Sequence, residues 1–296
     1  MSVDPSTITT GSFQGIAAID FTKMFSKNIY DLRTALSISR ELPLAQGDTF
    51  HLYKFNTTLA DGNVAEGATI PLSNVTRPVS TEVIKPLKYA TTVSAELIQK
   101  AGEPLALGQT NQEMLRSIAG VLLTNFVKFL GSNPTKITAD NFQKAVALGR
   151  AKALGINEFA GAPLVVLANP ADTANFLATQ QLQTTPDSTA YGVTTLGKYM
   201  GIQVIECNAV PAGKVYVTAV NNLVYAHANL SGSLQNSFNF ALDDTGSIGY
   251  FAVKDVHTMT INTGYYYQGV MFAEVPEGVI EVDLTSPTIP ASSPKK

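Results

Sequence analysis

Residues 48–84 form a long stretch of low charge that lacks the apolar pattern of an independently folding unit. The segment Val79–Val83 alternates between two faces, as a β-strand does, and a turn signal, ADGN, precedes it. Three prolines interrupt or border the stretch: Pro71, Pro78 and Pro86. Each removes a donor from a strand ladder, so the strands are edge-like or bent. A two-stranded ribbon is marginally stable alone. We therefore expect an excursion that leaves the body, returns to it and rests on another subunit.

The composition allows a globular body but leaves its surface short of charge. The chain has 296 residues, of which 45% are hydrophobic and 15% are charged. Typical soluble domains have roughly 25% charged residues. A surface with so few charges must be covered by Thr, Ser, Asn and Gln, or by neighbouring subunits.

Charge and the N-terminal residues exclude several classes of protein. The net charge of −3 argues against a protein whose main task is to bind nucleic acid. The N-terminal MSVDPSTITTGSF lacks the basic and apolar regions of a secretory signal. No apolar run approaches ~18 residues, so we expect no membrane partner. We expect a protein that stays in the cytoplasm or leaves it by lysis.

One helix is predicted before the extended stretch and one after it. After a polar N-terminal arm, Met1–Gly15, apolar residues recur every three or four positions. We expect this helix to be capped by Asp20 and stopped by Pro43. A short helix should follow the stretch, from a cap at Ser94 to Gly102.

The strongest helix is predicted over Thr110–Leu130. Thr110 and Glu113 have the spacing of a capping box, and Gly131 ends the helix. Its apolar residues cover a broad face, which indicates burial on more than one side.

The middle of the chain has the pattern of a mixed α/β module. A helix is predicted to start at Thr138 or Asp140. The sequence APLVVLANPADTANFLA predicts a buried strand and then a helix with Asn169 as N-cap and Pro170 in its first position. TTPDSTAYGVTTLG is expected to be a polar loop, followed by three short strands between residues 199 and 228.

The last part of the chain is predicted to be mostly strand. The candidate strands are Ser247–Val253, Val256–Ile261, Tyr265–Phe272 and Gly278–Leu284. Tyr265 and Tyr267 should face one way and Tyr266 the other.

No catalytic, cofactor or metal motif is recognisable. The histidines, His51, His227 and His257, lie in separate strand-like segments without a second ligand at metal spacing. His227 and His257 are expected to be sheet residues with a satisfied hydrogen bond. Cys207 is the only cysteine, and it is expected in a half-buried strand. Asp243 and Asp244 are expected in a turn. These patterns predict a protein that is not an enzyme and holds no cofactor.

The order of these elements resembles the major capsid proteins of tailed bacteriophages, which have the Hong Kong 97 type of fold. EGATIPLSNVTRPVSTEVIKPLKYATTVSAELIQKAG is similar to the family's passage from extended loop into peripheral domain. APLVVLANPADTANFLA is similar to its axial-domain strand and helix, and YMGIQVIECNAVPAGKVYV to its later strands. Gln203 stands where the family pattern often has Pro. The resemblance covers roughly Asp20 to Leu284.

The resemblance implies an α+β capsid fold with a defined division of the chain. Residues 1–47 would form an N-terminal arm and first helix, and residues 48–84 an extended loop over a neighbouring subunit. Residues 85–136 and 247–285 would form the peripheral domain, with residues 110–130 as its spine helix. Residues 137–246 would form the axial domain, and residues 286–296 a flexible tail.

The resemblance also implies an assembly and its partners. The chain would form hexamers and pentamers of an icosahedral shell around double-stranded DNA, assembled in the host bacterial cytoplasm. A portal, and separate scaffolding or decoration proteins, would be further partners. The residues expected at subunit interfaces are Phe21, Phe25, Phe55, Asp61, Glu66, Ile70, Arg77 and Lys85.

Three alternatives remain open at this stage. An encapsulin-like compartment shell shares the fold but would house a protein cargo. A soluble α/β enzyme would need convergent catalytic residues, which the sequence does not display. A tail-tube or decoration protein would be shorter and mostly β, against the long helix at residues 110–130.

Overall fold

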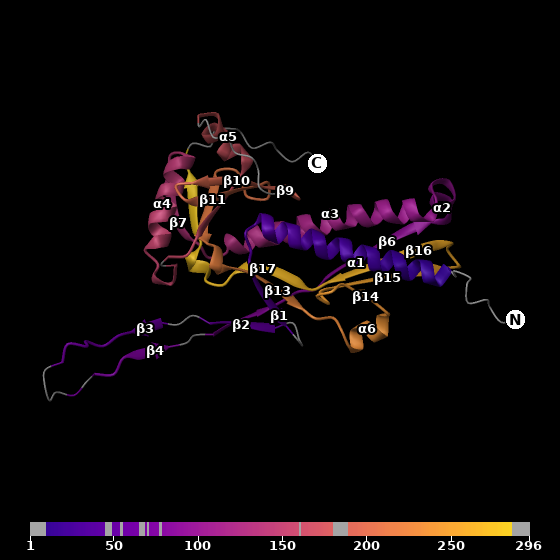
Figure 1. The fold of residues 1–296 in the computed structure, drawn as a ribbon, viewed down its shortest axis with the longest axis horizontal. Helices are drawn as coiled ribbons and strands as arrows, with labels where there is room; N and C mark the ends of the chain where they lie inside the picture. Colours follow the sequence, from indigo (N-terminus) through magenta and orange to yellow (C-terminus); the bar gives the residue numbers. More distant parts are fainter. Residues whose placement is uncertain are drawn as a thin grey trace.

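The chain folds into an elongated body from which one thin β-hairpin projects (Figure 1). The computed structural model describes residues 10–44, 49–53, 56–64, 69, 71–76, 79–159, 161–179 and 189–285. The body has a long unit built on two sheets and two long helices, and a second unit built on one large sheet.

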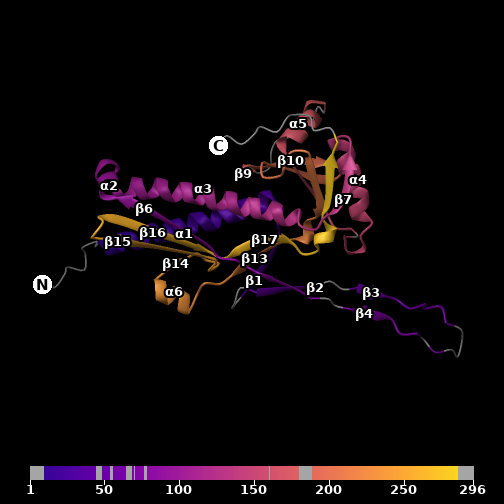
Figure 2. The same ribbon diagram turned by 180° about the vertical axis from the view of Figure 1, so that it is seen from behind.

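The long unit has a four-stranded antiparallel sheet in the order β14-β15-β16-β6. Two long helices, α1 and α3, lie side by side over this sheet (Figures 1 and 2). Its strands are β6 (Leu87–Ser94), β14 (Ala241–Leu242), β15 (Ile248–Asp255) and β16 (Thr260–Tyr267). Its helices are α1 (Thr10–Ala35), the short α2 (Ala95–Ala101), α3 (Glu103–Leu130) and α6 (Ser233–Phe238).

A three-stranded sheet, β1-β13-β17, extends the long unit toward the second one. Strands β1 (Arg40–Leu44) and β13 (Leu223–Ala228) run parallel, and β17 (Gly269–Ala273) is antiparallel to β13.

The second unit is a seven-stranded mixed sheet in the order β7-β18-β12-β8-β11-β10-β9. Its strands are β7 (Thr135–Ala139), β8 (Leu164–Ala168), β9 (Thr189–Ala190), β10 (Val193–Tyr199), β11 (Ile202–Cys207), β12 (Lys214–Ala219) and β18 (Ile280–Leu284). Helices α4 (Phe142–Leu154) and α5 (Pro170–Thr179) pack against it, and 3₁₀ turns occur at Asn157–Phe159, Val220–Asn222 and Pro276–Gly278.

The projecting hairpin, here called the β-arm, comprises residues 49–83. Near the body β2 (Thr49–Tyr53) pairs with β5 (Val79–Val83), and farther out β3 (Asn56–Thr58) pairs with β4 (Asn74–Thr76). The arm extends well beyond every other part of the chain (Figure 1). The predicted two-stranded excursion is therefore present.

The two largest apolar cores of the described residues hold the body together. In the first, α1 and α3 pack on the long sheet, and Phe21 lies against Tyr250 with ring centroids 4.7 Å apart. In the second, α4 packs on the seven-stranded sheet so closely that a Cβ on Gly149 would lie 2.5 Å from Val217 Cγ2. That position requires glycine because the helix backbone approaches the sheet directly.

Helix ends differ from the sequence predictions at several places. α1 begins at Thr10, so Asp20 lies inside the helix instead of capping it. It ends at Ala35, just before Ser37 adopts a φ of 58°, and Pro43 lies within β1. α3 begins at Glu103, and Thr110 Oγ1 donates to the Ala106 carbonyl 2.9 Å away, so Thr110 is no cap. Packing against the sheet sets these ends more strongly than local capping signals.

Other helix signals are confirmed. Ser94 caps α2, with its Oγ accepting from the Leu97 N–H at 3.4 Å. Gly131 ends α3. Pro170 is the first residue of α5, and Asn169 Oδ1 accepts from the Ala171 N–H at 2.9 Å.

Several predictions for the strands, and for segments that turned out to be strands, were wrong. Residues 135–139 form β7, and α4 is capped by Asn141, so no helix begins at Thr138 or Asp140. The expected polar loop contains β9 and β10 within its described residues. Residues 256–259 form a turn between β15 and β16, which places His257 outside a strand. The predicted strand Tyr265–Phe272 breaks between β16 and β17 because those two strands pair with different partners.

The sheets also cross the predicted domain division. β18, from the segment 247–285, lies in the seven-stranded sheet, whereas β13, from the segment 137–246, lies in the three-stranded sheet. Both assignments depend on pairing with distant strands, which the sequence does not display. The division by residue range stays a prediction.

Candidate intersubunit interface

The root of the β-arm is fixed to the body by a small apolar cluster. Phe50 and Ile84, at the two ends of the arm, are buried against Val224, Ala226 and Phe272. The Phe50 and Phe272 ring centroids are 4.8 Å apart. The arm therefore leaves the body from a defined place and in a defined direction.

The described residues of the outer β-arm form no core of their own. Leu59, Leu72 and Val75 are 78%, 95% and 59% exposed. The Ala60 N–H donates to Ser73 Oγ across the ribbon at 3.1 Å, which keeps the two strands together. Burying a leucine side chain is worth about 1.5–3 kcal/mol. The apolar side chains of the arm would gain this energy only by covering another surface.

The predicted interface residues are distributed unevenly over the described structure. Asp61 is exposed near the outer end of the arm and accepts a hydrogen bond from the Asn63 N–H at 2.9 Å. Lys85 is exposed at the base of the arm. Four further predicted residues, Phe55, Glu66, Ile70 and Arg77, lie outside the described residues. Asp61 and Lys85 are thus exposed near opposite ends of the β-arm.

Phe21 and Phe25 lie in the core instead of on a free surface. They are 2% and 1% exposed. Their rings contact Tyr265 and Tyr267, with centroid distances of 5.1 Å and 5.2 Å. The apolar face of α1 is used by its own subunit, so we leave these two residues out of the proposed interface.

The strand that leads into the β-arm, β1, is held to the body largely by polar contacts. Its side chains are exposed except for the half-buried Leu44. Arg40 Nη1 donates to the Asn221 carbonyl at 2.7 Å and pairs with Glu274. Glu41 Oε2 accepts a hydrogen bond from Arg33 Nη1 at 3.0 Å, and Glu41 Oε1 lies 2.9 Å from His227 Nε2. We call the group Arg33, Glu41 and His227 the β1 clasp.

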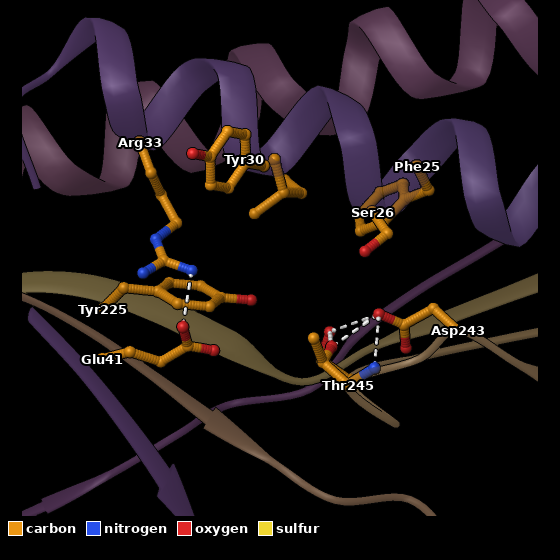
Figure 3. A pocket seen from close by; sticks show the side chains of 10 residues that line it. Phe25, Ser26, Tyr30, Arg33, Glu41, Tyr225, Asp243 and Thr245 are labelled. Carbon is orange, nitrogen blue, oxygen red and sulfur yellow. Dashed lines mark hydrogen bonds and ion pairs between the residues drawn. The ribbon is translucent and has the colours of Figure 1, made fainter. Parts of the chain in front are cut away.

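Arg33 and Glu41 of the β1 clasp line a cavity of about 140 Å³ between α1 and the sheets. Figure 3 shows the Arg33 guanidinium above the Tyr225 ring and paired with Glu41, with Asp243 on the far side. Asp243 Oδ1 accepts from the Ile248 N–H at 3.0 Å, and Oδ2 accepts from Thr245 Oγ1 at 2.5 Å, which confirms the predicted turn. Burial raises the pKa of Tyr225 to about 12. These contacts organise the subunit around the strand that carries the arm.

Sequence reasoning did not find the β1 clasp or Arg40. Glu41 and His227 are 186 positions apart, and Arg40 and Glu274 are 234 apart. A single charged residue on a short strand gives no local signal of such a partner. His227 itself was correctly predicted as a sheet residue with a hydrogen bond.

The described residues offer little chemistry of an enzyme. Cys207 is fully buried in β11, deeper than predicted, and burial raises the pKa of its thiol, which disfavours the reactive thiolate. Within the described ranges, no three His, Cys, Asp or Glu side chains gather as metal ligands. No helix in this part of the chain is both long and apolar enough to span a bilayer.

Comparisons with known proteins identify the fold. No protein-family model and no curated protein matches the sequence. Three similar structures are the capsid of a native gene transfer agent particle, the SrpI encapsulin from Synechococcus elongatus and the capsid of cyanophage A-1(L). Their TM-scores are 0.60, 0.59 and 0.58, at 12%, 9% and 12% sequence identity. The matches cover 86%, 88% and 86% of this chain and 91%, 90% and 93% of theirs.

The likeness extends over nearly the whole of both chains in each case. The chain therefore has the Hong Kong 97-like capsid fold, in agreement with the α+β fold expected from its sequence. This fold is present in phage shells and in an encapsulin alike.

Proposed function

We propose that this chain is the major capsid protein of a tailed bacteriophage. Copies assemble into hexamers and pentamers, which close an icosahedral shell around double-stranded DNA. Similar structures from phages and a gene transfer agent support the shell function. In this proposal the chain is a structural subunit and not an enzyme.

The β-arm is the observation that carries the proposal. It is fixed at its root by Phe50 and Ile84, yet it exposes Leu59 and Leu72 almost fully. A monomeric protein gains nothing from an apolar ribbon held away from its core. A shell subunit gains an interface with each neighbour that the ribbon covers.

Many modest contacts suffice in a closed shell. Each copy contacts several others, and binding at one contact raises the effective concentration at the next. The low charge of the chain, 15% of residues, reduces repulsion between identical surfaces. Strong single interfaces are therefore unnecessary.

The proposal also covers location and partners. The shell would assemble in the host bacterial cytoplasm and remain as the virion capsid. A portal, and separate scaffolding or decoration proteins, would act with it, and the packaged DNA would be contacted without sequence specificity.

Electron microscopy of the purified protein tests the shell function. We expect round shells or capsomer rings from the intact chain. The deletion variant replaces residues 60–72 by Asn-Gly, which joins Leu59 to Ser73, the next pair in the β3–β4 register, through a two-residue turn. It should unfold at the same temperature as the intact chain and form no shells. A matched control keeps the arm length and changes only Asp61→Asn. Arm deletion that unfolds the monomer would contradict this role of the arm.

An encapsulin-like compartment is the second candidate, because one similar structure is an encapsulin. The contents of particles from lysates distinguish the two. Nuclease-resistant double-stranded DNA of uniform length supports the phage capsid, whereas a stoichiometric protein cargo without DNA supports the compartment.

A further inference from the structure

One kind of turn recurs at four places in the described chain, with the same hydrogen-bond length each time. In this Asx turn the side-chain oxygen of an Asp or Asn accepts a hydrogen bond from the backbone N–H two residues ahead. The Oδ1 atoms of Asp61, Asn169, Asn229 and Asp255 accept from the N–H groups of Asn63, Ala171, Ser231 and His257, each at 2.9 Å. The ring that the hydrogen bond closes contains both the side-chain carbonyl carbon, Cγ, and the backbone nitrogen of the middle residue.

The middle residue of the turn differs at each place. It is Gly62, Pro170, Leu230 or Val256. Proline has no N–H. Leucine and valine carry a Cβ beside the nitrogen, and valine is branched at that atom. Glycine has no Cβ. Among these turns, therefore, only the one at Asp61 brings an N–H without a shielding side chain close to a carboxyl carbon.

The Asp61–Gly62 segment is otherwise unrestrained by the described residues. It follows β3 on the projecting arm (Figure 1), and Asp61, Gly62 and Asn63 are all exposed. A Cβ built on Gly62 would have no atom within 4 Å. The Gly62 N–H donates no hydrogen bond to another described residue. A rearrangement of this backbone would thus meet no resistance from the described part of the fold.

Other carboxyl groups that precede a polar residue are held by their own subunit. Asp172 and Asp243 are 3% and 8% exposed. Asp172 Oδ2 accepts from the Gly213 N–H at 2.8 Å, and Asp243 Oδ1 accepts from the Ile248 N–H at 3.0 Å. A reaction of either carboxyl would have to break these buried bonds. Asp61–Gly62 is also the single Asp-Gly pair of the sequence, which contains no Asn-Gly pair.

We propose that Asp61–Gly62 is a site of spontaneous backbone modification, at which the folded subunit converts Asp61 into an isoaspartyl residue. The Gly62 nitrogen attacks Asp61 Cγ. The proton of this nitrogen and the carboxyl hydroxyl leave together as water, and a succinimide ring forms. Water then opens the ring. Opening at Cγ restores aspartate, whereas opening at the backbone carbonyl of Asp61 leaves the chain joined through Cγ. The second step consumes the water that the first releases, so no oxidant, reductant or cofactor is needed.

The product changes the shape of the β-arm but not its charge. The new linkage adds one carbon to the backbone between Asp61 and Gly62, and the free carboxylate moves to the α-carbon. The arm of an aged subunit would therefore differ from that of a newly made one near its outer end. This chemistry goes beyond the proposed shell function and does not depend on it, so failure of either proposal leaves the other intact.

Ageing of the purified, folded protein at neutral pH and physiological temperature tests the site. A methyltransferase specific for isoaspartate, used with a labelled methyl donor, measures the amount of product. Digestion by an endoprotease that cleaves before aspartate, followed by mass spectrometry, locates it. We expect cleavage before Asp61 to be progressively lost without a change in peptide mass, and a minor peptide lighter by one water to mark the succinimide. Cleavage before Asp255, the matched internal control, should persist.

Two reciprocal substitutions test the role of the middle residue. Gly62→Val gives the first turn the middle residue of the second, and Val256→Gly does the reverse. Both positions are exposed, so both variants should keep the unfolding temperature of the unchanged chain. Gly62→Val should reduce the product at Asp61 to the background at Asp255. Product at Asp61 that persists in Gly62→Val, or equal product at Asp61 and Asp255 in the unchanged chain, would overturn the proposal.

The reverse variant should gain the modification. Val256→Gly should raise the product at Asp255 above its background, though not to the level at Asp61. Hydrogen bonds from the Thr258 side chain and the His257 N–H lower the pKa of Asp255, which keeps its carboxyl in the less reactive ionised form. No gain at Asp255 would show that glycine in this turn is insufficient, and would overturn the assignment.

The chain unfolded in guanidinium chloride provides the reference rate. Because the described structure does not restrain Gly62, the folded protein should form isoaspartate at Asp61 at a rate comparable with that of the unfolded chain. Product in the unfolded chain alone would show that the fold protects this bond, and would overturn the proposal.

Discussion

The seven-stranded sheet and the β-arm represent opposite uses of β-structure in one chain. Strand β8 is buried along its whole length between β11 and β12. Strand β4 is exposed along its whole length and has one partner, β3. Strand β8 is stabilised by packing within its own subunit, whereas strand β4 leaves its apolar surface free to contact another subunit. Mutations should therefore change folding in one region and assembly in the other.

The largest effect on folding should come from the buried sheet. Leu167, in β8, is completely buried. Leu167→Ala should lower the free energy of unfolding by about 2–5 kcal/mol, because it leaves a cavity between well-packed strands. Urea denaturation measures this change. Leu72→Ala, at a position 95% exposed in the arm, is the matched control and should be neutral. A comparable loss at both positions would break the comparison.

The alkaline limit of stability should also be set in the body. Burial raises the pKa of Tyr225 from 10.0 to about 12. The folded state thus holds this proton more tightly than the unfolded chain does. Its contribution is complete below pH 10 and should be lost as the pH rises from 10 through about 12.

Thermal unfolding across this pH range checks the Tyr225 prediction. Tyr225→Phe should flatten the decline without abolishing it, because burial also raises the pKa of the neighbouring Tyr267. An unchanged slope in the variant would exclude Tyr225 as a source of the decline.

A smaller and local effect is expected at the β1 clasp, where the two regions meet. Glu41→Gln removes the charge that Arg33 and His227 share. Because Glu41 is partly exposed, the loss should be about 1 kcal/mol. Hydrogen exchange should accelerate in β1 and β2 but not in β8. Uniform acceleration would show that the clasp supports the whole subunit and not only the arm.

The smallest effect on folding should accompany a clear effect on assembly. Leu72→Ser and Val75→Ser alter exposed arm residues and should change the free energy of unfolding by less than about 0.5 kcal/mol. The protein concentration needed for shell formation should rise. Light scattering measures that concentration, and an unchanged value would remove these side chains from the interface.

Local signals in the sequence predicted local structure well. Ser94, Gly131 and Pro170 mark helix ends as their chemistry requires. The prolines and alternation in residues 48–84 predicted the arm because a segment whose core residues, Phe50 and Ile84, lie only at its two ends has few ways to fold.

Features that depend on distant partners were missed. Thr110 and Glu113 have the spacing of a capping box, yet the helix passes through them because Ala106 and Leu107 are buried in an apolar cluster. The sequence predicts a loop at β10 because Val193 is the only apolar residue of this strand that is fully buried, and its neighbours are polar. The β1 clasp joins three elements whose sequences contain no sign of one another. Phe21 and Phe25 were predicted at the interface, but they are apolar because they pack in the core of their own subunit.

The position of β18 has a consequence for the order of folding. Strand β18, Ile280–Leu284, lies between β7 and β12 in the sheet, although it is the last strand of the described chain. During synthesis β7 and β12 are made before β18, so the strand edges that will pair with β18 stay unpaired until it is made. The seven-stranded sheet therefore becomes continuous only after Leu284 has left the ribosome. A nascent subunit is thereby kept from completing this sheet, and from offering it to other copies, until β18 has been made.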